Sequence, residues 1–304
     1  MERAQLEKMT ASLARYEESA RDRVMQEIQA LGLAENVIEL DTVGYTIVPN
    51  VLDQTTVERT LAAILARVDE LTGKRVDLKT ATAEDFQGMT YLPYLIYDDP
   101  VFTEVLLEPK PLALMTYLLG ESCQLSSLGT HFKGPGEEGV LPLHSDNGNG
   151  MPAPFPTYSQ VANINYALTP YSREAGALAL VPGSHKWCRP PTPNEWSLSG
   201  ETTNPSAIAM DINPGDAVIW HGNTWHGSFA RQIPGIRANL AVYMCRQYVQ
   251  TQEHHREKTP DEYWQANDNS TRLRTLLGGK QPYGWTKEGP DYTVMAKNPK
   301  SVWD

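Results

Sequence analysis

Apolar residues in the first third of the chain repeat every three or four positions, which is the spacing of one helix face. One stripe spans residues 6–31. A second follows Asp53, a residue type that caps helices, and stops at Gly73. A third region, 100–119, stops at Gly120. The pattern therefore predicts three helices in this part of the chain.

The hydrophobic period changes to two from residue 124 onward, as expected for strands that bury one face. The segment Asn213-Pro-Gly-Asp216 has proline and glycine where a type II turn requires them, so we expect a hairpin there. Many short strands separated by glycine and proline favour a double-sheet jelly roll of cupin-like architecture. The predicted fold is therefore mainly β, a double-stranded β-helix with the N-terminal helices packed on one sheet. The expected strands are 44–48, 124–133, 140–144, 161–168, 177–181, 207–212, 217–220 and 238–246.

Two histidines and one aspartate are the strongest candidates for chemistry. His144 and Asp146 lie two apart, so an extended backbone projects both to the same side. His226 follows about eighty residues later and would join them from another segment. Two imidazoles and one carboxylate hold a non-haem Fe(II) on one face and leave the other open. A His-x-Asp pair alone is more often a simple hydrogen bond, so the interpretation needs support from other residues.

That support comes from an arginine eleven residues beyond His226. Strand alternation places Arg237, Asn239 and Ala241 on one face. A buried guanidinium usually binds a carboxylate through two parallel hydrogen bonds. The carboxylate belongs either to the protein or to a dicarboxylate ligand that chelates the metal. Ser228 lies two residues past His226 and would add a hydroxyl donor to the same carboxylate.

Other histidines have alternative interpretations. His221 could replace His226 as the third ligand, but the step to Arg237 favours His226. His185 lies in a Pro-Gly-Ser turn, where packing is the expected role. His131 precedes the metal pair on a predicted strand and could face the pocket and touch a co-substrate, or else be an ordinary exposed or core histidine.

The loop 147–158 follows the metal pair directly and contains glycines, prolines and aromatic residues. Loops with this composition beside a site often form its wall or lid. Met151, Phe155 and Tyr158 are therefore candidates for substrate contact. They are candidates only because their loop follows the metal pair directly in the sequence.

Several motifs together resemble the phytanoyl-CoA dioxygenase family of Fe(II)/2-oxoglutarate oxygenases. The likeness covers about residues 44–247. The Pro-Gly-Ser-His element and the eleven-residue step from histidine to arginine make it fairly specific. The motifs are His144-x-Asp146, Gly176-Ala-Leu-Ala-Leu-Val-Pro-Gly-Ser-His185, Asn213-Pro-Gly-Asp216, Trp225-His-Gly-Ser228 and Arg237.

The resemblance implies a role for each matching residue. His144, Asp146 and His226 would bind iron, and Arg237 with Ser228 would bind the far carboxylate of 2-oxoglutarate. It also implies the jelly-roll fold. The expected cofactors are Fe(II), 2-oxoglutarate as co-substrate and O2.

Asn165 lies where this family often places a side chain against the co-substrate, although the member that gives the family its name has tryptophan there. The implied reaction oxidises, and most simply hydroxylates, an unactivated C–H of a small organic metabolite and converts 2-oxoglutarate to succinate. Two alternatives stay open. One is a cupin-like metal-dependent isomerase or lyase, and the other is a non-catalytic jelly roll that binds a ligand.

The length of 304 residues suits one large domain. We expect residues 1–304 to form a single oxygenase domain. Its parts would be a mainly helical segment at 1–120, a jelly-roll core with the metal site at 121–250 and a C-terminal extension at 251–304. A small-molecule substrate is the expected partner, and a homodimer is the candidate assembly.

Acidic residues outnumber basic ones by 37 to 26, for a formal net charge of −11. Binding to nucleic acid or to an anionic membrane needs a basic surface, so we expect neither. The absence of an apolar run of about twenty residues and of a secretion signal predicts a cytoplasmic protein. Cys123, Cys188 and Cys245 are odd in number and widely spaced, which favours free thiols.

Overall fold

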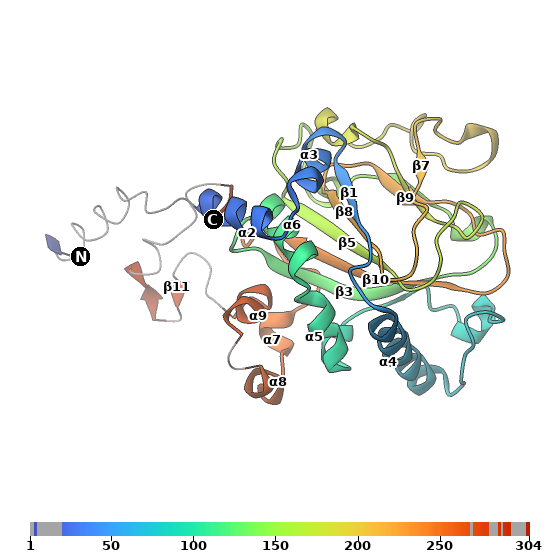
Figure 1. Cartoon of the computed structure of the whole chain (residues 1–304), viewed down its shortest axis with the longest axis horizontal. Helices are drawn as coiled ribbons and strands as arrows, with labels where there is room; N and C mark the ends of the chain where they lie inside the picture. The colour runs from blue at the N-terminus through green and yellow to red at the C-terminus, as the bar shows by residue number, and fades with distance from the viewer. Residues whose placement is uncertain (1–2, 5–19, 268–269, 280–284, 287, 293–301) are drawn as a thin grey trace.

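Two antiparallel β-sheets form the centre of the molecule, with helices beside them (Figure 1). The computed structural model describes residues 3–4, 20–267, 270–279, 285–286, 288–292 and 302–304. The helices are α2 Ala20–Ala30, α3 Ala34–Thr42, α4 Gln54–Thr72, α5 Pro100–Leu106, α6 Pro109–Leu119, α7 His255–Lys258, α8 Asp261–Ala266 and α9 Thr271–Leu276. The strands are β1 Tyr45–Val48, β2 Tyr91–Leu92, β3 Gln124–Lys133, β4 Leu141–His144, β5 Val161–Ala167, β6 Leu178–Leu180, β7 Ile208–Ala209, β8 Ala217–His221, β9 His226–Ser228, β10 Arg237–Cys245, β11 Trp285–Thr286 and β12 Gly289–Pro290.

The order of strands is that of a jelly roll. The larger sheet runs β1-β8-β5-β10-β3-β2, and the smaller one runs β4-β9-β6-β7. Neighbours along the chain, such as β4 and β5, lie in different sheets, which is how a double-stranded β-helix alternates between its layers. The predicted fold class is confirmed.

The outer face of the larger sheet packs on the helices. Four register partners on neighbouring strands are fully buried in the apolar core that the helices complete. Tyr166 extends from the same face and donates a hydrogen bond from its hydroxyl to the Val105 carbonyl of α5 at 3.1 Å. The N-terminal helices therefore cover one sheet, as expected. The four partners are Ile219, Ile164, Val242 and Leu128.

The inner face of the same sheet is polar. At the adjacent position on each strand, the register partners are Trp220, Asn163, Tyr243 and Ser127, and all four line a cavity between the sheets. The period-two alternation read from the sequence therefore separates an apolar layer under the helices from a polar layer around the cavity. The strands position the site by this alternation.

The start and the end predicted for the second helix are confirmed in α4. Asp53 accepts a hydrogen bond from the Thr56 amide at 2.7 Å, and Gly73 ends the helix with φ 71°. The region 100–119 is two helices, α5 and α6, because Pro109 has no amide hydrogen to continue the first one. The first predicted helix is described only from Ala20 onward, as α2, and its earlier part lies outside the described residues.

The hairpin predicted at 213–216 is wrong, although the turn is present. The Asp216 amide donates to the Asn213 carbonyl at 3.1 Å, and Gly215 has φ 95°. The strands on either side, β7 and β8, belong to different sheets. The turn therefore connects the two layers, because the chain crosses between them at this point.

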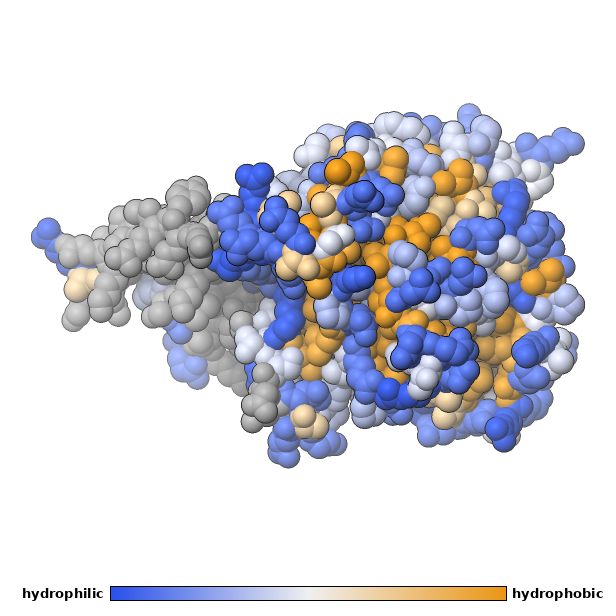
Figure 2. All heavy atoms as spheres, in the orientation of Figure 1, coloured by the Kyte–Doolittle hydropathy of each residue, from blue (hydrophilic) through white to orange (hydrophobic). Residues whose placement is uncertain are grey.

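The surface in Figure 2 is mostly hydrophilic, with apolar residues visible between the charged ones over the helices and strands of this face. Within the described residues, none of the helices has both the length and the apolar character needed to cross a bilayer.

Candidate metal centre

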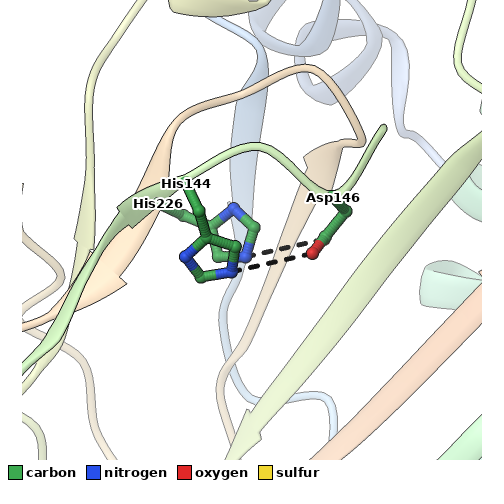
Figure 3. Close-up of side chains that lie close together, drawn as sticks. All are labelled: His144, Asp146 and His226. Carbon is green, nitrogen blue, oxygen red and sulfur yellow. Dashed lines mark ion pairs between the residues drawn. The ribbon is translucent and has the colours of Figure 1, made fainter. Parts of the chain in front are cut away.

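His144, Asp146 and His226 come together in the structure (Figure 3). Their ligand atoms all lie within 4.8 Å of one another. The His144 Nε2 lies 3.7 Å from Asp146 Oδ1, and the His226 Nε2 lies 3.5 Å from Asp146 Oδ2. The two imidazole centroids are 4.2 Å apart. Two nitrogens and a carboxylate thus face one point, an arrangement that can hold one metal ion.

Strand pairing brings the distant histidine alongside. In the β4–β9 pair, His144 is the register partner of His226. Asp146 begins the short 3-10 turn Asp146–Asn149, just after the strand ends. Ser145 between them is extended, and its hydroxyl donates to the Gly222 carbonyl at 3.0 Å. Ser145 therefore points away from the cluster, as the alternation predicts.

Hydrogen bonds fix how each ligand is presented. His144 Nδ1 lies 2.9 Å from the Pro142 carbonyl, and His226 Nδ1 lies 3.0 Å from the Thr224 carbonyl. Because a carbonyl only accepts, each Nδ1 is the protonated nitrogen, and each Nε2 keeps its lone pair for a metal. Burial lowers the pKa of His226 to about 4, so this imidazole is neutral at neutral pH.

Asn163 holds the carboxylate of the cluster. Its Nδ2 donates a hydrogen bond to Asp146 Oδ2 at 2.6 Å. It comes from the polar inner face of β5, where Trp220 is its register partner. Asn163 was not among the residues predicted from the sequence. The signal available was its place two residues before Asn165 on the same strand face.

A cluster of cations lies at another part of the cavity wall. The Arg237 guanidinium donates from Nη1 to the Gly176 carbonyl at 2.5 Å and lies over the Tyr171 ring at 4.6 Å. Its Nε is buried and has no hydrogen-bond partner within the described chain. No carboxylate among the described side chains forms an ion pair with it. The sequence left two possible partners for Arg237, a carboxylate of the protein or a carboxylate of a ligand. The described structure contains no protein carboxylate in that role.

Lys133 is a second buried basic residue, and it was not predicted from the sequence. It is the register partner of Arg237 in the β10–β3 pair, and its Nζ donates to Ser228 Oγ at 2.6 Å. Burial and the positive charge of Arg237 lower the pKa of Lys133 to about 7. Alternation could have indicated it, because Lys133 lies two residues after His131 on one strand.

The cavity has a volume of about 740 Å³, and both sheets line it. It contains the metal cluster together with Arg237, Ser228, Asn165 and His131. Asn165 accepts a hydrogen bond from the Tyr171 hydroxyl at 3.0 Å.

The His131 ring is open to the cavity and lies 4.6 Å from the Tyr91 ring. Desolvation by the cavity walls, together with Arg237 and Lys133, lowers the pKa of His131 to about 4.

Met151, Phe155 and Tyr158 do not line this cavity. The Phe155 amide donates to the Cys188 carbonyl at 2.7 Å, and the Phe155 side chain is buried. The Tyr158 ring packs under the Arg246 guanidinium at 5.0 Å. Phe155 and Tyr158 therefore pack elsewhere, and contact of the three residues with a substrate stays a prediction.

The two competing histidines lie outside the cluster. The ring centroids of His185 and His221 are 5.5 Å apart, and His221 Nδ1 accepts from the Asn223 amide at 3.0 Å. Burial lowers the pKa of both. In the described part of the chain, neither joins a group that could hold a metal ion.

A jelly roll with this ligand set defines a class of non-haem metal proteins. Residues 40–238 match the family described as phytanoyl-CoA dioxygenase (PhyH). The chain belongs to this family. The family resemblance read from the sequence is thus confirmed.

Curated relatives agree. The chain is 29% identical over 208 residues to dioxygenase af480 of Aspergillus fumigatus. The aligned region covers 68% of this chain and 62% of that protein. It is 30% identical over 135 residues to dioxygenase FUM3 of Gibberella moniliformis, covering 43% and 41% respectively. The match therefore spans less than two thirds of the length of either relative.

Solved structures share the fold. HygX from Streptomyces hygroscopicus, with nickel and 2-oxoglutarate bound, superposes with a TM-score of 0.59 at 20% identity, covering 72% of this chain and 88% of that one. The epimerase SnoN from nogalamycin biosynthesis, in complex with Fe3+ and alpha ketoglutarate, gives 0.51 at 22% identity, covering 72% and 85%.

Proposed function

We propose that the protein is an Fe(II)- and 2-oxoglutarate-dependent oxygenase. The observation that supports this most directly is one cavity with two different binding groups. A set of two imidazole nitrogens and a carboxylate suits Fe(II), and the buried Arg237, whose Nε has no partner among the described residues, suits an incoming carboxylate. A dicarboxylate that chelates the metal satisfies both groups at once. The donor chemistry of the described residues therefore fits iron and 2-oxoglutarate.

His144, Asp146 and His226 would hold the iron. When bound, iron activates O2 and couples the oxidation of a substrate to the decarboxylation of 2-oxoglutarate to succinate. The task of the chain is to present three ligands in fixed orientation. The carbonyls of Pro142 and Thr224 fix the imidazoles.

Arg237 and Ser228 would bind the far carboxylate of 2-oxoglutarate. Ser228 lies two residues beyond His226 on β9, so its side chain shares a face with that ligand. Asn165 and His131 are proposed to flank the co-substrate, because both line the cavity that contains the cluster. The neutral imidazole of His131 would contact the ligand without adding a third positive charge.

The reaction we propose is hydroxylation of an unactivated C–H in a small, uncharged organic metabolite. The wall around Tyr91, Ser127 and Tyr243 is polar but uncharged, so a charged substrate group there would lose its hydration without a counter-ion. A volume of about 740 Å³ falls in the range of small-molecule pockets. Two proteins of this fold have been solved with small molecules bound, HygX with hygromycin B and SnoN with nogalamycin RO.

The test is succinate release from 2-oxoglutarate, with Fe(II) and O2, in the presence of candidate substrates. His144→Ala and Asp146→Ala should each abolish it, and His254→Ala, which removes an exposed histidine outside the cavity, should not. A metal-dependent isomerase or a binding protein would release no succinate. Mass analysis of the product for one added oxygen then separates hydroxylation from other oxidations.

A cytoplasmic location and a homodimer stay predictions. Light scattering of the purified protein would measure the assembly, and fractionation of its native cells would measure the location.

A further inference from the structure

Lys133 occupies an unusual position for a lysine. Only 5% of its surface is exposed, and its side chain lies in the cavity wall beside Arg237. Gly176 makes room for it, because a Cβ at this position would lie 2.9 Å from Lys133 Cε. Gly176 also has φ 74°, a conformation that favours glycine. The local backbone is thus shaped around the two cations.

Nothing in the described chain balances this pair of charges. The hydrogen-bond acceptor of Lys133 is the Ser228 hydroxyl, which is neutral. The negative charge of Glu137 favours the protonated amine, but the two side chains form no ion pair in the described structure. Two buried cations side by side repel each other, and a buried charge is costly unless it is paired. Part of this cost is relieved because the pKa of Lys133 is lowered to about 7, and an anion bound beside the pair would stabilise the protonated lysine.

Ser228 connects the two cations to one ligand. Ser228 Oγ accepts one hydrogen bond from Lys133, and its own hydrogen is available to donate to a ligand. The Arg237 side chain lines the same cavity, and its Nε has no hydrogen-bond partner among the described residues. A carboxylate has two oxygens that together accept up to four hydrogen bonds. One carboxylate can therefore receive donors from all three side chains.

We propose that Lys133 is a second anchor for the distal carboxylate of the co-substrate, acting together with Arg237. This rests on the proposed function and goes beyond it, because the arginine and serine are the residues that the family resemblance assigns. Lys133 is a binding residue in this proposal, and it selects dicarboxylates over monocarboxylic 2-oxo acids.

The test compares two ligands that differ only at the distal end. 2-Oxoglutarate and 2-oxopentanoate share the chelating keto acid, and only the first has a second carboxylate. Binding of each is measured by calorimetry without O2, with Mn(II) present. The variants are Lys133→Met, which removes the charge, Lys133→Arg, which keeps it, and Lys110→Met, which removes an exposed lysine outside the cavity.

Lys133→Met should weaken 2-oxoglutarate binding about 10- to 100-fold, the range for losing a charge-assisted hydrogen bond. Binding of 2-oxopentanoate and Mn(II) should stay unchanged, and Lys133→Arg should retain most of the affinity. In turnover, Lys133→Met should raise the KM for 2-oxoglutarate while kcat at saturation stays close to that of the wild type. Lys110→Met should match the wild type throughout.

Equal losses for both ligands would overturn the proposal, because a merely structural lysine affects them alike. Unchanged 2-oxoglutarate binding in Lys133→Met would overturn it too. If Lys133→Met does not fold by circular dichroism, Lys133→Gln provides the same comparison. Failure of the proposed function would give a different result. In that case, any binding of 2-oxoglutarate to the wild type would be unaffected by replacing Asp146.

Discussion

Gly227 separates the third candidate ligand from Ser228, and the structure leaves no room for a side chain there. A Cβ on Gly227 would lie 2.3 Å from the Leu141 carbonyl oxygen, 2.9 Å from Leu198 Cδ1 and 3.0 Å from the Pro142 carbonyl carbon. Ordinary contact begins at 3.4 Å. Two of these three contacts are with backbone, which cannot rotate away. Gly227→Ala must therefore push β9 away from β4.

The size of the effect follows from the register. His226 and His144 are partners in the β4–β9 pair, so a shift of about 1 Å between these strands separates the two imidazoles by a similar distance. Metal–ligand distances tolerate only about 0.2 Å. Misplacement by about 1 Å near a reacting centre can cost on the order of 100-fold. We expect Mn(II) affinity to fall about 10- to 100-fold and succinate release to fall with it.

The assay is Mn(II) titration by calorimetry, with thermal unfolding measured in parallel. Gly150→Ala is the matched control, because a Cβ there meets nothing within 4 Å. The control should bind Mn(II) like the wild type. Unaltered Mn(II) affinity in a folded Gly227→Ala would refute the reasoning, because it would mean that the strand spacing does not set the ligand geometry.

Three further predictions concern the same cavity. Arg237→Ala should raise the KM for 2-oxoglutarate, because losing a charged pair costs about 2–5 kcal/mol, and steady-state kinetics at saturating iron measure it; an unchanged KM would mean that the co-substrate binds elsewhere. Asn163→Ala frees one oxygen of Asp146 and should lower Mn(II) affinity about 10- to 100-fold by calorimetry, whereas equal affinity would assign Asn163 a packing role. The affinity for 2-oxoglutarate should fall as pH rises above about 7, because the pKa of Lys133 is lowered to about 7 by burial and Arg237, and a bound carboxylate favours its protonated form. The other charged or titratable groups around Lys133 are Arg237, Glu137 and His131. His131 does not contribute to the change, because its pKa of about 4 keeps it neutral in this range. Calorimetry from pH 6 to 9 should show this fall in the wild type and much less of it in Lys133→Arg, and a flat profile in both would contradict the assignment.

Local signals in the sequence predicted several elements accurately. The cap at Asp53 and the stop at Gly73 define α4 because both act within one helical turn. The alternation along 124–133 predicted the full length of β3 for a similar reason, since each residue's face depends only on its neighbours. The same logic placed His144 and Asp146 on one side of the chain.

Contacts between distant segments decided what the sequence could not. The loop 147–158 has the composition of a site wall, but Phe155 packs away from the cavity against the chain near Cys188. Likewise the turn at 213–216 looks local, yet its two strands pair with different partners. Composition does not specify the direction in which a loop leaves a sheet, so neither outcome was readable from neighbours along the chain.

The sequence by itself determined the kinds of atoms at the site: two imidazoles, a carboxylate, a guanidinium and a hydroxyl, each at a spacing that matches the family. The tertiary structure decided which other side chains meet them. Lys133 lies opposite Arg237, and Asn163 reaches Asp146, because of the register between strands that are far apart in the chain. Register is set by the packing of a whole sheet against its neighbours, so these partners become visible only once the two layers are assembled.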